Sequence, residues 1–201
     1  MDKKVNTAKT VRQQEIVDAA RKIISTQGIE KLTVRAIAQE LKITDGALYR
    51  HFRSKKEIIS LLIDDIEQTL LATIMDAAGK SDDPLKKLEN ILLTHLSYAE
   101  QRKGFTFIII NETMSIKDKS LQRKMFSVIN KYLKMIEDIL REGVKAGSFR
   151  YSMDFISAGV AFFGMIQSIV TLWALSGFKY SFNRRRITDI LNVYSRGILI
   201  R

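Results

Sequence analysis

Residues 44–50 combine small, hydroxyl and charged side chains on one short segment. On a helix, Thr44, Asp45, Gly46, Ala47, Tyr49 and Arg50 would face outward, whereas Leu48 would face the core. Small residues allow a backbone to approach base edges. The segment therefore suits contact with nucleic acid, although an ordinary surface helix could carry the same residues.

The sequence contains no motif for catalysis or for metal binding. The chain has no Cys, and His51 and His95 are its only histidines, so no zinc-ligand cluster or thiol nucleophile can be assembled. No glycine-rich phosphate loop, paired-carboxylate motif or nucleophile triad is present. We therefore expect no enzyme, no catalytic residue, no metal and no cofactor.

The elements that must position these side chains are helices. One Pro and ten Gly in 201 residues leave little room for a turn-rich β-fold. Apolar residues recur at helical spacing, and capping residues mark the helix starts. The predicted helices are 11–27, 34–41, 45–52, 55 to about 78, 84–101, 105–114, 119–146, 155–175 and 184 to about 199.

This pattern predicts an all-α protein of about nine helices in two domains. Residues 1–60 would form a three-helix helix-turn-helix domain, joined through a long helix to a regulatory and dimerisation domain over residues 61–201. In the first domain, the helix after the break at Lys42-Ile43 would direct Leu48 and Phe52 inward. Its residues Thr44 to Ala47, Tyr49 and Arg50 would face outward, where a major groove is read.

The amino-acid sequence of this segment resembles the DNA-binding domain of the TetR family of bacterial regulators. The resemblance covers residues 28–58, and its core is Thr44-x-Gly46-x-Leu48-Tyr49-x-His51-Phe52-x-x-Lys55. It implies that Thr33, Thr44, Tyr49, His51 and Lys55 contact the DNA backbone. It also implies that Arg35 pairs with a guanine and that Gly46 and Ala47 pack against bases.

Two residues depart from the family pattern. Lys42 occupies the turn position where Gly is favoured, and a non-Gly residue in the left-handed region costs about 1–2 kcal/mol. Either the turn carries this strain, or its backbone differs slightly from that of relatives. Asp45 stands where relatives often carry a basic or neutral residue. Because a carboxylate repels phosphate, we expect Asp45 to face bases, where it could accept a hydrogen bond from a cytosine amino group.

Net charge is +11 and concentrates at the two ends of the sequence. Residues 1–60 carry 13 Lys/Arg against 7 Asp/Glu, residues 61–178 carry 14 of each, and residues 179–201 carry 6 against Asp189 alone. Basic ends favour a polyanion partner, although a solubilising excess of charge would look the same. Lys3, Lys4, Lys9 and Arg12 could add DNA contacts, and no signal peptide is visible, so we expect a cytoplasmic, nucleoid-associated protein.

Residues 155–178 carry no charged side chain and are long enough to cross a membrane. Interspersed Ser, Thr, Gln and Gly favour instead a helix with one face inward and the other on a partner subunit, so no membrane partner is expected. The resemblance implies that the last two helices pair in a two-fold homodimer. The predicted interface residues are Ala158, Ala161, Phe162, Leu172, Trp173, Ile187, Leu191 and Tyr194.

The resemblance also places an effector pocket among the helices between residues 79 and 178. Candidate lining residues are aromatic, Met or polar side chains in apolar stretches, namely His95, Phe107, Asn111, Met114, Phe126, Asn130, Phe163 and Gln167. Each of them could equally be plain core. Few charges in these stretches point to a hydrophobic or weakly polar effector.

The sequence thus predicts a dimeric, sequence-specific transcriptional regulator. Its partners would be a palindromic operator in double-stranded DNA, a second copy of itself and an unknown small-molecule effector. Members of the family are most often repressors, so we expect a repressor. Two alternatives stay open. One is a membrane-tethered DNA-binding protein, and the other is a DNA-binding regulator controlled by protein partners without a small-molecule ligand.

Overall fold

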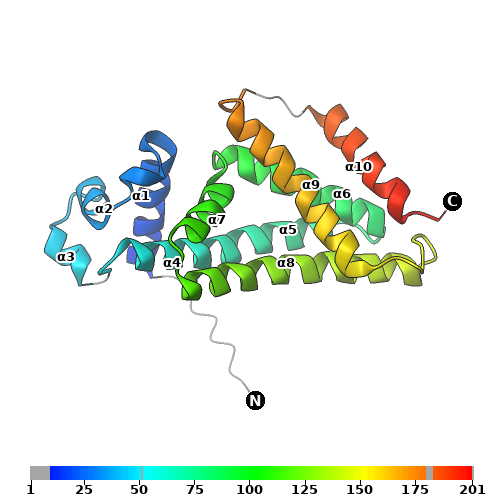
Figure 1. The fold of residues 1–201 in the computed structure, drawn as a ribbon, viewed down its shortest axis with the longest axis horizontal. Coiled ribbons are helices and arrows are strands. Elements are labelled where there is room, and N and C mark those ends of the chain that lie inside the picture. Colours follow the sequence, from blue (N-terminus) through cyan, green and yellow to red (C-terminus); the bar gives the residue numbers. More distant parts are fainter. Residues whose placement is uncertain (1–9, 51, 180–182, 201) are drawn as a thin grey trace, which may run out of the picture. The chain divides into compact units, whose positions relative to one another are not determined.

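A computed structural model describes residues 10–50, 52–179 and 183–200 (Figure 1). Within them the chain forms helices joined by short turns, and its only β pairing is one isolated antiparallel bridge between Phe149 and Leu199. The predicted all-α class is therefore confirmed. The chain divides into two compact units, Met1–Asp65 and Ile66–Arg201.

The first unit holds the short helices. They are α1 (Val11–Gln27), the 3-10 turn η1 (Ile29–Lys31), α2 (Val34–Glu40), α3 (Asp45–Tyr49) and α4 (Lys55–Ile66), whose last residue already belongs to the second unit. Capping explains three of the starts, because the hydroxyls of Thr10, Thr33 and Thr44 each accept a hydrogen bond from a backbone amide three residues on. The core of this unit is aliphatic and includes the fully buried Ile16, Ile23, Leu32, Ile37 and Leu62.

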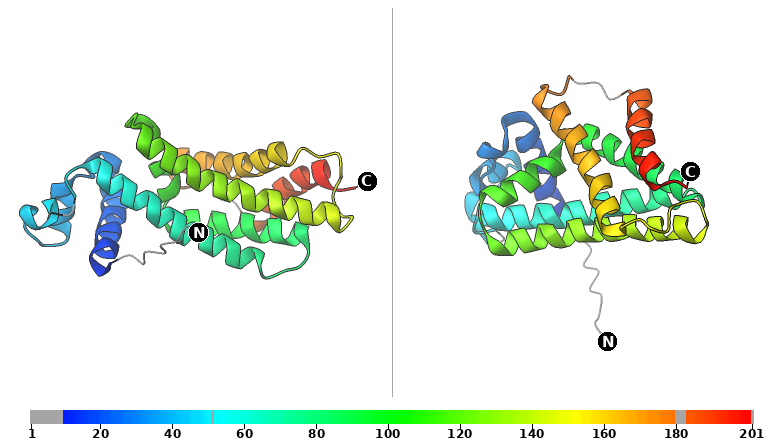
Figure 2. Two further views of the ribbon diagram at one scale, coloured as in Figure 1. Left: turned by 90° about the horizontal axis from the view of Figure 1, so that it is seen from below. Right: turned by 45° about the vertical axis from the view of Figure 1, so that its right-hand side comes forward.

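The second unit is a bundle of longer helices. They are the π turn η2 (Glu67–Leu71), α5 (Ala72–Ala78), α6 (Pro84–Gln101), α7 (Phe105–Ser115), α8 (Lys119–Lys145), α9 (Phe155–Leu175) and α10 (Arg184–Ile198). α5 packs on α6, α8 packs on α9, and α6 also contacts α8, α9 and α10 (Figure 2). Asp83, Asp118, Asp154 and Asn183 cap the starts of α6, α8, α9 and α10.

The π turn is the main departure from the predicted helices. The sequence predicts one helix from residue 55 to about 78, whereas the structure interrupts this run at Glu67–Leu71. When α4, η2 and α5 are counted as one helical run, the described residues contain the nine predicted helices. Neither Pro nor Gly occurs in the π turn, so the sequence gives no signal for it.

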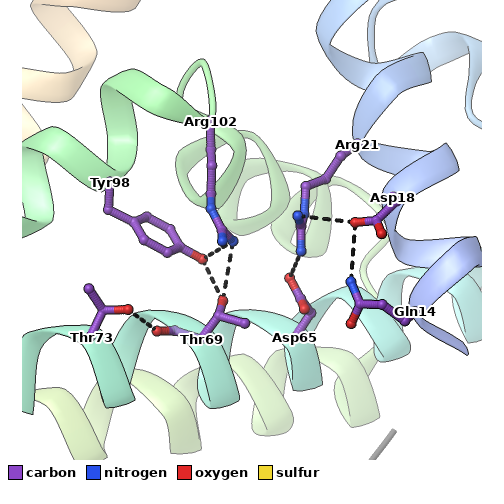
Figure 3. Close-up of polar contacts among 8 residues, drawn as sticks. All are labelled: Gln14, Asp18, Arg21, Asp65, Thr69, Thr73, Tyr98 and Arg102. Carbon is purple, nitrogen blue, oxygen red and sulfur yellow. Dashed lines mark hydrogen bonds and ion pairs between the residues drawn. The ribbon is translucent and has the colours of Figure 1, made fainter. Parts of the chain in front are cut away.

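A polar cluster joins the π turn to the end of α6 (Figure 3). The hydroxyls of Thr69 and Tyr98 lie 2.7 Å apart, and the Arg102 guanidinium donates to both, at 3.3 Å and 2.6 Å. The same guanidinium lies 4.1 Å from the centre of the Tyr98 ring. Side-chain contacts from α6 therefore hold the irregular turn in place.

Candidate nucleic-acid interface and interior cavities

The turn between α2 and α3 adopts one of the two geometries that the sequence leaves open for Lys42. Lys42 adopts a left-handed backbone conformation with φ of 55°, and its neighbour Ile43 donates from its amide to the Ala38 carbonyl at 3.0 Å. These contacts end α2 and redirect the chain into α3 within four residues. The lysine thus occupies the strained conformation that the family gives to glycine.

α3 has one buried face and one open face. Leu48 is 1% exposed, whereas Thr44, Asp45, Gly46, Tyr49 and Arg50 are all exposed and Ala47 is half-buried. No heavy atom lies within 4 Å of where a Cβ on Gly46 would stand. At Gly46 the helix therefore has no protruding side chain, so a binding partner can approach its backbone closely.

Arg35 and Asp45 lie beside this open face. The Arg35 Nε and Asp45 Oδ2 atoms are 4.0 Å apart, and both side chains are at least half exposed. A pair of this kind contributes about 0–1 kcal/mol to stability. Both side chains are consequently available to other partners, and each holds the other near the start of α3.

The other residues predicted to contact the DNA backbone lie in different local settings. Thr33 and Thr44 use their hydroxyls to accept cap hydrogen bonds from Ala36 and Ala47, at 3.0 Å and 3.3 Å. Lys55 donates from its ammonium to the Ile29 carbonyl at 3.2 Å, so this side chain also ties η1 to the start of α4. His51, Lys3, Lys4 and Lys9 lie outside the described residues.

An ion pair inside the first unit holds α1 against α4 (Figure 3). Asp65 is fully buried, and its carboxylate accepts from the Arg21 guanidinium at 2.7 Å. Arg21 also reaches Asp18 on its own helix, at 3.3 Å. Sequence patterns could not select this pair, because its members stand 44 residues apart and neither belongs to a motif.

A small cavity of about 20 Å³ lies inside the second unit. Its wall is aliphatic and aromatic with four polar side chains, and the lining residues are Ile66, Leu70, Leu71, His95, Thr106, Ile110, Met125, Val128, Ile129, Tyr132, Phe163 and Gln167. Among the predicted effector residues, His95, Phe163 and Gln167 meet here. Thr106 and Tyr132 were missed, since no pattern in their own helices distinguishes them from core residues.

His95 and Tyr132 form the polar centre of this cavity. The His95 Nδ1 and the Tyr132 hydroxyl oxygen are 3.2 Å apart, and both side chains are buried. Burial lowers the pKa of the His95 imidazole from 6.5 to about 4 and raises the pKa of the Tyr132 hydroxyl. At neutral pH both groups are therefore uncharged. The buried Thr106 hydroxyl has no hydrogen-bond partner among the described residues.

The other five predicted effector residues lie elsewhere. Phe126 and Asn130 line a shallow groove on the outer face of α8 with Arg123, Ser127, Lys131 and Lys134. On α7, Met114 is 57% exposed, Phe107 is half-buried, and Asn111 is exposed and donates to the Phe107 carbonyl at 2.8 Å. On α8 the periodic apolar positions, such as Leu121, Met125 and Val128, are buried, and Phe126 and Asn130 lie off this stripe. On α7 apolar residues occur on both faces, so periodicity does not separate an inner from an outer face.

The predicted interface residues fall into two groups. Phe162, Ile187 and Leu191 are buried in the protomer's own core, and Tyr194 donates from its hydroxyl to the Ala158 carbonyl at 3.0 Å. Ala161 and Leu172 are exposed, whereas Trp173 is half-buried. The structure adds an exposed, uncharged stripe along α9 that comprises Ile156, Val160, Gly164, Ser168, Leu172 and Leu175.

α9 is also long and apolar enough to cross a membrane, judged by length and composition alone. Its opposite face is covered inside the second unit, where Gly159, Phe162, Ile166, Ile169 and Val170 are buried against neighbouring helices. A core helix of a soluble bundle has the same length and composition.

Both parts of the chain match known families. Residues 16–62 match the family described as bacterial regulatory proteins, tetR family, and residues 63–194 match the family described as YsiA-like protein, C-terminal region. Among curated proteins, the nucleoid occlusion factor SlmA of Vibrio atlanticus is 26% identical over 175 residues, which are 87% of this chain and 89% of that protein.

Solved structures share the fold. The fatty acid degradation regulator FadR from Bacillus halodurans superposes with a TM-score of 0.82 at 22% identity, covering 94% of this chain and 96% of that one. FadR from Bacillus subtilis, solved in complex with stearoyl-CoA, gives a TM-score of 0.79 at 22% identity and covers 92% and 98%.

Proposed function

The chain belongs to the TetR family of bacterial regulatory proteins, and from this premise we propose that it is a dimeric repressor that binds a palindromic operator and leaves it when an effector binds. The exposed face of α3 carries the proposal. It combines an open glycine with Tyr49 and Arg50 on a helix whose other face is fixed by the buried Leu48. A two-fold pair of such helices can read two half-sites one helical turn apart.

Gly46 offers the sharpest test of this surface. Because nothing lies within 4 Å of its Cβ direction, Gly46→Gln should fold normally but hold α3 away from the bases. We expect its affinity for an operator, selected from random duplex DNA, to fall at least about ten-fold, equivalent to about 1.4 kcal/mol. Met75→Gln, at an exposed site on α5 outside the predicted dimer helices, is the control. Equal affinity of the two variants would exclude α3 as the recognition helix.

Substitution of Asp45 tests whether this residue recognises a base or only changes the overall affinity for DNA. We propose that Asp45 accepts from a base and that Arg35, 4.0 Å away, pairs with a neighbouring guanine. Repeating the selection with Asp45→Ala should change the preferred sequence more than the overall affinity. A variant that binds all DNA more tightly with an unchanged preference would show that Asp45 only repels phosphate.

We propose a hydrophobic or weakly polar effector for the cavity lined by His95, Phe163 and Gln167. Its support is an apolar wall with a few neutral polar groups, including an unpaired Thr106 hydroxyl that a ligand could satisfy. A volume of about 20 Å³ accommodates about one water, so a ligand must open the cavity before it fits. An effector that binds the opened form better would shift the protein toward that form.

The small cavity also favours a second candidate, a DNA-binding regulator governed by a protein partner. Curated relatives of this chain are named nucleoid occlusion factors, and the cavity around His95 leaves little preformed space for a ligand. Fractionating a cell extract by ultrafiltration separates the two candidates. Release of operator DNA by the low-mass filtrate supports an effector, whereas release only by the retained proteins supports a partner.

We further propose a cytoplasmic, nucleoid-associated location without a membrane partner. One face of α9 packs inside the second unit, and the exposed stripe along its other face suits a second copy of the chain. Cell fractionation tests this proposal, since a membrane-tethered protein would sediment with the membranes.

A further inference from the structure

A second and much larger cavity lies among α6, α9 and the start of α10. Its volume is about 520 Å³, within the range of small-molecule sites. The lining residues are Leu93, Leu96, Ser97, Ala99, Glu100, Ile169, Val170, Trp173, Phe178, Lys179, Arg184 and Ile187. We call it the α6–α9–α10 cleft. It shares no lining residue with the cavity around His95, so the two are separate sites.

The apolar end of the cleft is built around an aromatic pair. The Trp173 and Phe178 rings meet edge to face with centroids 4.7 Å apart. Phe178 holds this position in a left-handed conformation, with φ of 65°, and donates from its amide to the Trp173 carbonyl at 3.0 Å. A bulky residue is rarely found in that conformation, and such strain often marks a functional site.

The charged side chains of the cleft are mostly basic. Lys179 and Arg184 belong to the lining, and Glu100 is its only carboxylate. Arg184, Arg185 and Arg186 form the first turn of α10, where no acidic residue is present. Positive side chains are unfavourable at a helix N-terminus, because that end already carries a partial positive charge. A bound anion near Arg184 would relieve this repulsion.

We propose that the α6–α9–α10 cleft binds an amphiphilic anion, that is, an aliphatic or aromatic body with one carboxylate, sulfonate or phosphate group. The body would lie against Leu96, Val170 and Trp173, and the anionic group would lie between Lys179 and Arg184. This site goes beyond the proposed function, because neither DNA binding nor the cavity around His95 requires it.

Trp173 makes the proposal directly measurable, because it is the only tryptophan in the chain. Decanoate, titrated below its micelle concentration into the full-length protein, should change the Trp173 fluorescence in a saturable manner. Decanol and decyltrimethylammonium carry the same apolar chain without the negative charge. We expect both to bind at least about five-fold more weakly, the factor that corresponds to about 1 kcal/mol.

Charge variants then locate the anionic group. Lys179→Gln and Arg184→Gln should each weaken decanoate binding roughly two- to five-fold, as expected for an exposed ion pair. Glu100→Gln should strengthen it, because it removes the carboxylate from the lining. Arg185→Gln is the matched control, since Arg185 belongs to the same turn but does not line the cleft.

Several outcomes would overturn the proposal. Equal binding of decanol would show an apolar site without anion recognition, and equal effects of Arg184→Gln and Arg185→Gln would show only diffuse charge attraction. Loss of decanoate binding in Ile110→Phe, which adds bulk to the cavity around His95, would place the ligand there instead. Dissociation of a dimer on decanoate addition would assign the cleft to the contact between two copies. Each result is independent of operator binding.

Discussion

The ion pair between Arg21 and Asp65 is the single polar contact whose loss we expect to cost most. Asp65 is fully buried, so Asp65→Asn would leave the Arg21 guanidinium without its buried partner charge. Breaking such a pair costs about 3 kcal/mol. We therefore expect the free energy of unfolding, measured by denaturant titration, to fall by about that amount.

Asp18→Asn is the matched control for Asp65→Asn. Asp18 contacts the same guanidinium at 3.3 Å, but its side chain is 58% exposed. Water screens this pair, and its loss should cost less than about 1 kcal/mol. Similar losses in both variants would mean that burial of Asp65 does not determine the strength of the pair.

His95 predicts a pH dependence of stability in a defined window. The pKa of His95 is about 4 in the folded protein and about 6.5 in the unfolded chain. Below pH 6.5 the unfolded chain therefore binds a proton at His95, whereas the folded protein does not bind it until the pH approaches 4. The free energy of unfolding is therefore highest, as far as His95 determines it, above pH 6.5, and it declines as the pH falls toward 4. Between pH 7.5 and pH 5 the loss should be about 2 kcal/mol.

A non-titrating variant isolates this effect. His95→Gln removes the titrating group, so its free energy of unfolding should depend less on pH than that of the wild type over the same window, by about 2 kcal/mol. Parallel pH profiles of the two proteins would show that His95 takes up its proton in the folded state as well.

At the residue scale, the sequence predicted what local rules control. The caps at Thr33 and Thr44 follow from chain-neighbour geometry, and the structure shows both. For Lys42 the sequence left two backbone conformations open, and the structure has the left-handed one. The contact between His95 and Tyr132 joins residues 37 apart. Composition and spacing carry no information about such a pairing, which depends on how α6 and α8 pack.

At the element scale, the packing of α8 against its following turn depends on one glycine. A Cβ on Gly143 would stand 2.1 Å from the Phe149 ring, which is itself fully buried. Gly143→Ala should therefore force the ring aside and destabilise the protein by about 1–3 kcal/mol, despite the higher helix propensity of alanine. Thermal unfolding measures the change.

Gly197→Ala provides the comparison for Gly143→Ala. No atom lies within 4 Å of a Cβ at Gly197, so alanine there should leave stability unchanged or raise it by up to about 1 kcal/mol. If both variants unfolded at the wild-type temperature, the contact between Phe149 and Gly143 would not be tight in solution.

Helix boundaries were predictable because caps mark them, but the faces of the helices were not. Asp83-Pro84, Asp154 and Asn183 start helices where the sequence predicts them. On α9, however, Phe162 is buried in its own protomer while Leu172 is exposed. The whole helix is apolar, so periodicity gives no contrast from which an inner and an outer face could be assigned.

At the scale of the whole molecule, the exposed stripe of α9 is the largest apolar feature that the proposed dimer could cover. Ile156, Val160, Leu172 and Leu175 are 64%, 51%, 52% and 81% exposed, and with Gly164 and Ser168 they form an uncharged row about four residues apart. Contiguous apolar surface of this kind is typical of an interaction site, and we propose that its partner is a second copy of the chain. The small residues in the middle of the row would let two copies of the helix approach closely.

Leu172→Glu tests the stripe as a dimer interface. In a two-fold contact the substitution places a carboxylate in an apolar surface on both copies, and the dissociation constant measured by sedimentation should rise at least about 100-fold. Operator affinity should fall with it, because one recognition helix reads only one half-site. Met75→Glu, on an exposed methionine of α5, should change neither quantity. A Leu172→Glu protein that remains dimeric would move the interface away from the exposed face of α9.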